Sequence, residues 1–431
     1  MSIFYDCFFI IFSIFYIPYL IFKGKLHKDF RERFTVPSEK FKGIISPLWI
    51  HAVSVGEVVI AVKITRELKK ILPNKKIIIS TTTLTGNKLA REQGSGLFDA
   101  IFYFPIDLSC IVKNFIRVIK PAVFLIIETE LWPNIISEMK RAHVPVILVN
   151  GRLSAKSFRN YKRVRFFIKK ILQNVELFLM QGDVDAERII TLGACREKVK
   201  VYGSIKFDEY SFSDSKKYTK RFFSFREDDN VIIAGSTHAP EEEYILDIYL
   251  KLKSKYSNLK LVIVPRHIER ISSIEKLIRA KSFLCKKFSD ILAGRGKNST
   301  HADIILIDTI GHLRALYNTA TIVFVGGSLV KKGGQNPLEP AGLGKPIVFG
   351  PHMYNFSSIT KILLETKSAL MVKDKDDLLK EIDTLLADKI KQEFLGRNAL
   401  DIIRKNSGAL TRGAEMIKLV LERGEQNAPV S

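Results

Sequence analysis

The sequence predicts an α/β protein made of two Rossmann-like, doubly wound domains that follow an apolar amino-terminal segment. Short runs of β-branched and aromatic residues alternate along the chain with segments of helical period, which is typical of parallel sheets covered by helices. A polar stretch at 208–220 interrupts this alternation, which then restarts. The length of 431 residues agrees with two or three domains of roughly 100 to 200 residues each.

The amino-terminal segment predicts a membrane anchor at residues 1–24. Asp6 is the only charge from residue 3 to residue 22, and the uninterrupted apolar run begins at Cys7. As a helix, that run of sixteen residues covers about 24 Å, less than the roughly 30 Å hydrocarbon core, so a full span also needs residues 3–6. The basic residues follow the run, which favours a cytoplasmic location for the rest of the chain rather than a cleaved signal peptide. They are Lys23, Lys25, Lys28, Arg31 and Arg33. A buried or amphipathic helix is the alternative.

The first Rossmann-like domain is expected at residues 25–209. Its predicted strands are 49–55, 76–82, 101–104, 123–127, 146–149, 177–180 and 199–202. Its clearest helical segments are 57–71, 108–119 and 134–142.

The second domain is expected at residues 210–431. Its predicted strands are 231–234, 261–264, 304–307, 322–325, 347–349 and 370–372. Two such domains facing a central cleft bring together the strand ends at which these folds bind ligands. Glycosyltransferases of the GT-B type are built this way, as are other enzymes, so the fold alone does not give the function.

Composition narrows the classes of protein and partner. The chain is 46% hydrophobic and carries a formal net charge of +23, which excludes a disordered composition and indicates a polyanionic partner. Cys7, Cys110, Cys195 and Cys285 are scattered without a CxxC pair, so neither a disulfide framework nor a structural zinc site is expected. No helix-turn-helix, RNP or KH pattern is visible, and nucleic acid is therefore not the expected polyanion.

Three loops after strands of the first half carry candidate catalytic residues. Glu57 follows a glycine at the start of a helix, where a carboxylate is stabilised by the helix dipole and is suited to act as a general base. Its structural alternative is an ordinary acidic residue of a first helical turn. Glu128 and Glu130 both follow the predicted strand 123–127, and capping rarely explains two such carboxylates. Lys206, in a third loop, is suited to stabilise negative charge, although it could also be a plain surface lysine.

The second half predicts a nucleotide site. The segment 325–340 contains two glycine pairs and runs into a helix, a pattern that predicts backbone amides cradling a phosphate. Glu339 in that helix is placed to accept hydrogen bonds from ribose hydroxyls, and Arg266 adds a cation at the end of another strand. The stretch 308–312 is a further strand-to-helix turn.

These motifs together resemble bacterial 3-deoxy-D-manno-octulosonic acid (Kdo) transferases. In chain order they read HAVSVGE, STTTLTG, ETELWPN, NGRLS, GSIKFD, VPRHIER and FVGGSLVKKGGQNPLEP. The resemblance covers nearly the whole chain. It implies an inverting, metal-independent GT-B transferase without a cofactor, anchored by a single pass in the bacterial inner membrane, with its catalytic domains on the cytoplasmic side. It also implies CMP-Kdo as the donor and the lipid A precursor lipid IVA as the acceptor; another GT-B nucleotide-sugar transferase of the cell envelope is the alternative.

The resemblance also implies roles for individual residues. Glu57 becomes the proton acceptor, and Glu128 and Lys206 stabilise the transition state. The implied CMP contacts are Pro265, Arg266, Ile310, Gly311, His312, Asn336, Pro337, Leu338 and Glu339. Two positions depart from the family pattern: Gln335 stands where a histidine is usual, and His312 stands where many members have an acidic residue.

Two further features allow more than one interpretation. Asp183 and Asp185 imitate the DxD spacing of metal-dependent transferases, but they lie at a predicted helix start, where capping is the simpler explanation. Residues 152–170 contain eight Lys/Arg and no acidic residue. Such a helix suits the anionic lipid of the inner membrane or the phosphates of a lipid A precursor, and equally a core helix with a solvated basic face.

Overall fold

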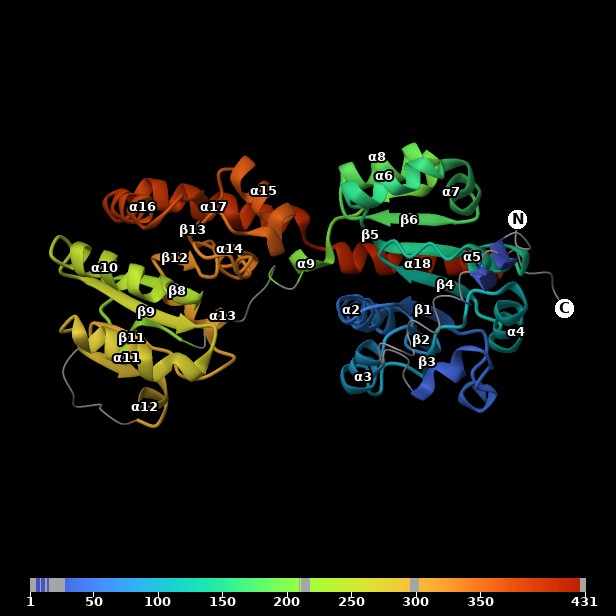
Figure 1. Cartoon of the computed structure of the whole chain (residues 1–431), viewed down its shortest axis with the longest axis horizontal. Coiled ribbons are helices and arrows are strands. Elements are labelled where there is room, and N and C mark those ends of the chain that lie inside the picture. The colour runs from blue at the N-terminus through green and yellow to red at the C-terminus, as the bar shows by residue number, and fades with distance from the viewer. Residues whose placement is uncertain are drawn as a thin grey trace. The chain divides into compact units, whose positions relative to one another are not determined.

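The computed structural model describes residues 5–7, 9–11, 14, 28–208, 210, 218–294 and 302–426. The chain divides into two compact units (Figure 1). The first unit contains the described residues up to Ile205 and those from Ser407 onward, and the second unit runs from Lys206 to Asn406.

The first unit is built on a parallel sheet. In the described residues it has seven strands in the order β3-β2-β1-β4-β5-β6-β7. Its strands are β1 (Leu48–Ala52), β2 (Ile77–Thr81), β3 (Ala100–Tyr103), β4 (Val123–Ile127), β5 (Val146–Gly151), β6 (Leu177–Met180) and β7 (Val199–Val201). Its α-helices are α2 (Val55–Ile71), α3 (Leu84–Gln93), α4 (Ser109–Ile119), α5 (Pro133–Arg141), α6 (Ala155–Arg163), α7 (Arg165–Leu172), α8 (Asp183–Leu192) and α18 (Ala409–Gln426). Short 3-10 helices span Lys28–Arg33, Ser38–Phe41 and Arg196–Lys198.

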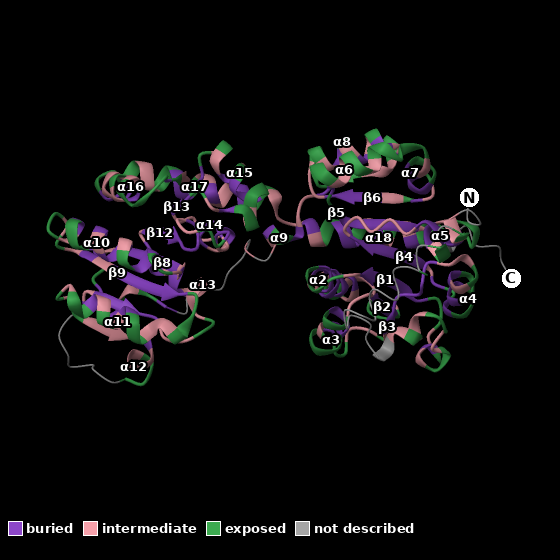
Figure 2. Cartoon of the chain, in the orientation of Figure 1, coloured by how far each residue is buried: buried purple, intermediate pink, exposed green. Residues whose placement is uncertain are grey.

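Both faces of this sheet are buried, as the run of apolar residues in each strand requires. Alternate side chains of a strand face opposite sides, so Leu48 and Ile50 pack in one core with α2, α3 and α18, whereas Trp49 packs in the other with α4, α5, α7 and α8. Figure 2 shows buried strands beneath helices whose outer faces are exposed.

The second unit repeats this architecture. Its described residues form a parallel sheet of seven strands in the order β10-β11-β9-β8-β12-β13-β14. Its strands are β8 (Asn230–Thr237), β9 (Leu259–Pro265), β10 (Cys285–Lys287), β11 (Ile304–Leu306), β12 (Ile322–Val325), β13 (Ile347–Phe349) and β14 (Leu370–Met371). Its α-helices are α10 (Glu241–Lys253), α11 (Ile271–Ala280), α12 (Phe288–Leu292), α13 (Leu313–Leu316), α14 (Leu338–Ala341), α15 (Ser357–Glu365), α16 (Lys375–Ala387) and α17 (Lys389–Asn406). The short helix α9 (Ile205–Asp208) bridges the boundary between the units, and 3-10 helices span Lys220–Phe223, Ile268–Arg270, Tyr317–Thr319 and Tyr354–Phe356.

Two doubly wound parallel sheets therefore confirm the predicted α/β class. The expected linker 208–220 lies partly outside the described residues, since 209 and 211–217 are not described. Lys206 falls at the start of the second unit rather than inside the expected first domain of 25–209.

The last helix differs from the expected division, which placed all of 210–431 in the second domain. Helix α18 belongs to the first unit, where Ala414 and Ile417 are buried in the core beside α2. Arg412 adds a hydrogen bond from Nη2 to the carbonyl oxygen of Tyr202, at 2.6 Å. The amphipathic pattern of α18 predicts that one of its faces is buried, but the pattern does not say which of the two units that face packs against.

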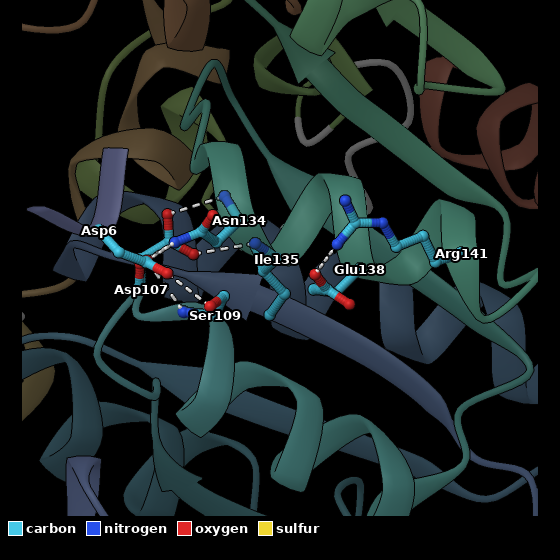
Figure 3. Close-up of polar contacts among 7 residues, drawn as sticks. All are labelled: Asp6, Asp107, Ser109, Asn134, Ile135, Glu138 and Arg141. Carbon is cyan, nitrogen blue, oxygen red and sulfur yellow. Dashed lines mark hydrogen bonds and ion pairs between the residues drawn. The ribbon is translucent and has the colours of Figure 1, made fainter. Parts of the chain in front are cut away.

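Most of the expected anchor at residues 1–24 lies outside the described residues. The part that is described packs on the first unit: Asp6 accepts hydrogen bonds from the backbone N–H of Ser109 at 3.1 Å and from Nδ2 of Asn134 at 2.6 Å (Figure 3). Tyr5 stacks on Phe167 of α7, with ring centroids 6.2 Å apart. Within the described residues, no helix has both the length and the apolar character needed to cross a bilayer.

Candidate active site

Glu57 lies in the first turn of α2 and is held by hydrogen bonds. Its Oε2 accepts from the backbone N–H of Val53 at 2.8 Å, and its Oε1 accepts from the hydroxyl of Ser54 at 2.8 Å. Ser54 in turn caps α2 by accepting the N–H of Glu57. This is a variant of the capping box, because the carboxylate accepts the N–H of Val53, the residue before the cap, and the Ser54 hydroxyl. Burial raises the pKa of Glu57 and the charge of Glu128 adds to the rise, while the hydrogen bonds from Val53 and Ser54 oppose it.

Glu128 and Glu130 lie on the loop that follows β4. Burial, and then the charges of Glu57 and Glu128, raise the pKa of Glu130 to about 7. Each of the three carboxylates thus acts on another, so residues 57, 128 and 130 form one group at the carboxyl edge of the sheet. A carboxyl with a pKa near neutrality is suited to accept or release a proton at physiological pH.

The strand ends around this group carry unusual backbone geometry. Ile127 of β4 pairs with Val149 of β5, so Glu128 and Asn150 stand side by side just after that pair. Both are left-handed, with φ of 60° and 59°, a conformation that costs energy for a side chain such as glutamate. Asn150 is fully buried, and its amide has no hydrogen-bond partner among the described residues. Such strain and unpaired polarity gather at functional sites.

His51 supports the site without titrating near neutrality. Its ring stacks on Phe104 at 3.7 Å, and its Nδ1 lies 3.1 Å from the hydroxyl oxygen of Ser80. Burial lowers the pKa of His51 to about 3, so the ring is neutral. The Phe104 ring also lies at a tilt against Trp132, with centroids 5.6 Å apart, so contacts among three rings link the loop after β4 to β1.

The predicted nucleotide contacts gather at the carboxyl ends of the second sheet. Pro265 is buried at the end of β9, and Arg266 beside it is exposed. Ile310 is 78% exposed and Gly311 has φ of 92°, so this turn presents backbone to solvent. His312 is partly buried, with its Nδ1 2.7 Å from the hydroxyl oxygen of Tyr218.

Asn336 shapes the loop that precedes the short helix α14. Its Oδ1 accepts the N–H of Leu338 at 3.1 Å, and its Nδ2 donates to the hydroxyl of Tyr210 at 2.7 Å and to Oε1 of Glu339 at 3.2 Å. Pro337 and Leu338 are buried, whereas Asn336 and Glu339 are partly exposed. Only the last two can present polar side chains to a ligand.

The amides predicted to cradle a phosphate are already occupied. The Glu241 carboxylate accepts the N–H of Gly327 at 2.7 Å, of Ser328 at 3.0 Å and of Leu329 at 3.0 Å, and also that of His238 at 3.0 Å. These groups bind an anion, as expected of such a loop, but the anion is a side chain of the protein. The prediction that this part of 325–340 holds a phosphate is therefore corrected.

In the part of the chain that the structure describes, no three His, Cys, Asp or Glu side chains are arranged to hold a metal ion. Asp183 and Asp185 lie at the start of a helix, as predicted, in the first turn of α8, but the N-cap residue is Gly182 and not either aspartate. Asp185 accepts the N–H of Leu153 at 2.8 Å, which is a structural role.

Comparison with known proteins decides the family. Residues 28–209 match a family model described as 3-deoxy-D-manno-octulosonic-acid transferase (kdotransferase). A 3-deoxy-D-manno-octulosonic acid transferase of Haemophilus influenzae is 34% identical over 383 residues, covering 87% of this chain and 87% of the relative. The chain belongs to the Kdo transferase family.

A further relative and two solved structures are also similar to this chain. A bifunctional glycosyltransferase/methyltransferase of Fusobacterium nucleatum is 37% identical over 84% of this chain, which spans 57% of that relative. Among solved structures, a putative UDP-N-acetylglucosamine 2-epimerase from Listeria monocytogenes has a TM-score of 0.55 at 14% identity, covering 88% of this chain and 97% of that one. A glycosyltransferase from Rickettsia africae has a TM-score of 0.52 at 12% identity, covering 87% and 98%. These structures share the two-domain fold.

Family membership makes the chain a glycosyltransferase and confirms the resemblance seen in its motifs. Of the residues predicted to be catalytic, the structure brings Glu57 and Glu128 together, while Lys206 is exposed on α9 at the start of the second unit. Glu130 was a candidate together with Glu128, but the family resemblance gave it no role, and the structure adds it to the group. Its pairing with Glu128 after a buried strand was the available signal.

Proposed function

We propose that this chain transfers Kdo from CMP-Kdo to the lipid A precursor lipid IVA, with inversion at the anomeric carbon. The observation that carries the proposal is the group of Glu57, Glu128 and Glu130 at one sheet edge in a member of this family. Raised pKa values at Glu57 and Glu130 suit proton removal from a sugar hydroxyl near neutral pH.

Glu57 acts as the base in this proposal. It takes the proton of an acceptor hydroxyl as that oxygen attacks the anomeric carbon, and the bond to the CMP phosphate breaks with its electron pair leaving on CMP. The hydrogen bonds from Val53 and Ser54 fix the orientation of the carboxylate. Glu128 and Lys206 stabilise charge in the transition state, and no metal or cofactor takes part; full activity in EDTA is expected.

The donor is assigned to the second unit. Arg266, the exposed turn at Ile310 and Gly311, and the polar groups of Asn336 and Glu339 support this assignment, because they are accessible at the carboxyl ends of its sheet. Backbone groups of such a turn can form hydrogen bonds with a nucleotide base, and the Arg266 guanidinium can form an ion pair with a phosphate.

Attachment to the cytoplasmic side of the bacterial inner membrane, through the amino-terminal segment, belongs to the same proposal. The basic segment divides at Val164 into α6 and α7, and there Val164 is 52% exposed and Phe166 is 77% exposed. Lys170 lies over the Phe166 ring at 4.1 Å. Exposed apolar side chains surrounded by cations suit an anionic lipid surface.

Vesicle flotation tests the membrane contact. Phe166→Ser is expected to weaken binding to vesicles containing phosphatidylglycerol, and added salt is expected to weaken it further. Leu250→Ser is the matched control, since Leu250 is 48% exposed on α10. Vesicle binding that is unchanged by anionic lipid, by salt and by Phe166→Ser would contradict the proposed membrane contact.

Transfer itself is tested with purified protein, CMP-Kdo and lipid IVA. Glu57→Gln is expected to lower kcat by about 100- to 10,000-fold, the range for loss of a general base, while CMP binding is retained. Glu92→Gln, on the exposed surface of α3, is the control. Activity with a different nucleotide sugar but not with CMP-Kdo would favour another envelope transferase of the same fold.

A further inference from the structure

Three segments of the second unit bring basic side chains to one place. Thr237 at the end of β8 pairs with Pro265 at the end of β9, so His238 and His267 follow neighbouring parallel strands. Their rings meet edge to face, with centroids 5.3 Å apart. A Cβ placed on Gly327 would lie 3.3 Å from Cδ2 of His238 and 3.5 Å from Cβ of Lys332, which places Lys332 beside the same histidine.

The carboxylates of Glu241 and Glu242, which lie near these side chains, already have partners. Glu242 binds Arg270 through two hydrogen bonds of 2.7 and 3.0 Å and accepts the Thr237 hydroxyl at 2.9 Å. Glu241 is satisfied by four backbone N–H groups. Neither carboxylate is left to pair with the basic side chains at positions 238, 267 and 332.

His238 itself has spare hydrogen-bonding capacity. Its Nε2 is buried and has no partner among the described residues. Burial lowers the pKa of His238, and the positive charges of His267, Lys332 and Arg270 lower it further, against the opposing effect of Glu242. Such an environment disfavours a second proton on His238 until an anion arrives to balance it.

We propose that His238, His267 and Lys332 form the subsite that binds an oxyanion of the donor. The glycine loop beside them cannot supply this contact, because Glu241 fills its amides. The oxyanion is either the phosphate of the nucleotide or the carboxylate of the sugar acid, which share the chemistry that imidazolium and ammonium groups recognise. The inference rests on the proposed function for the identity of the donor.

Protonation is linked to binding at this subsite. An anion bound beside His238 raises the pKa of its imidazole, so His238 takes up a proton when the ligand binds. By linkage, affinity rises as the pH falls, by at most about tenfold per pH unit for one proton. The wild-type protein should therefore bind the donor more tightly at pH 6 than at pH 8.

The experiment compares Lys332→Met and His238→Gln with Lys331→Met. Lys331 is an exposed cation one residue away and serves as the matched control. Binding of CMP is measured by calorimetry at pH 6 and pH 8, and KM for CMP-Kdo is measured in the transfer assay. Thermal unfolding checks that each variant is folded.

A phosphate subsite predicts that both test variants weaken CMP binding by tenfold or more, and that His238→Gln lowers the ratio of the CMP affinities at pH 6 and pH 8 below the ratio for Lys331→Met. A carboxylate subsite predicts unchanged CMP affinity with a tenfold or larger rise in KM for CMP-Kdo. If both variants match Lys331→Met in both assays, the proposal is overturned.

A second readout separates this proposal from the proposed function. Histidine resonances, with His238 assigned from His238→Gln, are titrated with and without CMP or CMP-Kdo. A rise in the pKa of His238 on adding either ligand supports the subsite even if no transfer to lipid IVA occurs. An unmoved resonance with both ligands overturns it even if transfer is efficient.

Discussion

Replacing Glu130 with glutamine should make the first unit more stable at alkaline pH and leave it nearly unchanged at acidic pH. In the folded chain, burial and the charges of Glu57 and Glu128 raise the pKa of Glu130 to about 7. In the unfolded chain the carboxyl is exposed and returns to its ordinary value near 4.5. Ionised Glu130 therefore opposes folding, and glutamine removes that opposition.

The sign and size follow from proton linkage. Below pH 4.5 the carboxyl is protonated in both states, so it has no effect on the free energy of unfolding. Between pH 4.5 and 7 only the folded state holds the proton, and stability is lost as the pH rises. Each tenfold change in proton affinity corresponds to about 1.4 kcal/mol. Allowing for the partial exposure of Glu130, the free energy of unfolding of Glu130→Gln should rise relative to the parent chain by about 2 kcal/mol between pH 5 and pH 8.

Tryptophan fluorescence isolates the unit concerned. The chain has two tryptophans, Trp49 and Trp132, and both belong to the first unit. Urea unfolding followed by their emission at pH 5 and pH 8 therefore compares Glu130→Gln with the parent chain, with Glu92→Gln as control. An equal difference at both pH values, or a loss of stability at pH 8, would refute the assignment of a raised pKa.

Two further substitutions test the hydrogen bonds that position the sites. Asp6→Ala removes the acceptor of hydrogen bonds from Ser109 and Asn134. It should lower the free energy of unfolding by about 2 kcal/mol and speed proteolysis of the amino-terminal segment. An unchanged rate of cleavage would contradict the contact between Asp6 and the first unit. Glu241→Gln should destabilise the second unit by about 3 kcal/mol, because a carboxylate with four N–H donors is replaced by a neutral group. Hydrogen exchange of the loop after β12 measures this, with the exposed Glu243→Gln as control.

The sequence predicted the sheets well because their strands are buried on both faces. The runs at 123–127, 177–180, 322–325 and 347–349 coincide with β4, β6, β12 and β13. The strand Cys285–Lys287 was not predicted, since its CKK sequence lacks such a run. Periodicity describes one element at a time and could not assign α18 to the first core.

The same limit explains the error at the glycine loop. Glycine pairs before a helix predict exposed amides, and the amides are indeed directed at an anion. That anion is Glu241, which lies 86 residues from Gly327 in the sequence. Only the tertiary structure brings such a partner into contact, so a local pattern predicts the anion-binding geometry but not whether the anion is internal or a ligand.

The structural and catalytic interpretations of Glu57 are compatible rather than exclusive. Reciprocal capping of the helix start explains an acidic residue at this position without any function, and the hydrogen bonds between Glu57 and Ser54 are formed. A carboxylate has about four lone-pair sites, however, and the bonds from Val53 and Ser54 use one on each oxygen. The remaining sites can accept a proton, while the cap fixes the direction in which they point. Burial and the charge of Glu128 raise the proton affinity of this otherwise ordinary first-turn carboxylate, and that combination is what a positioned base requires.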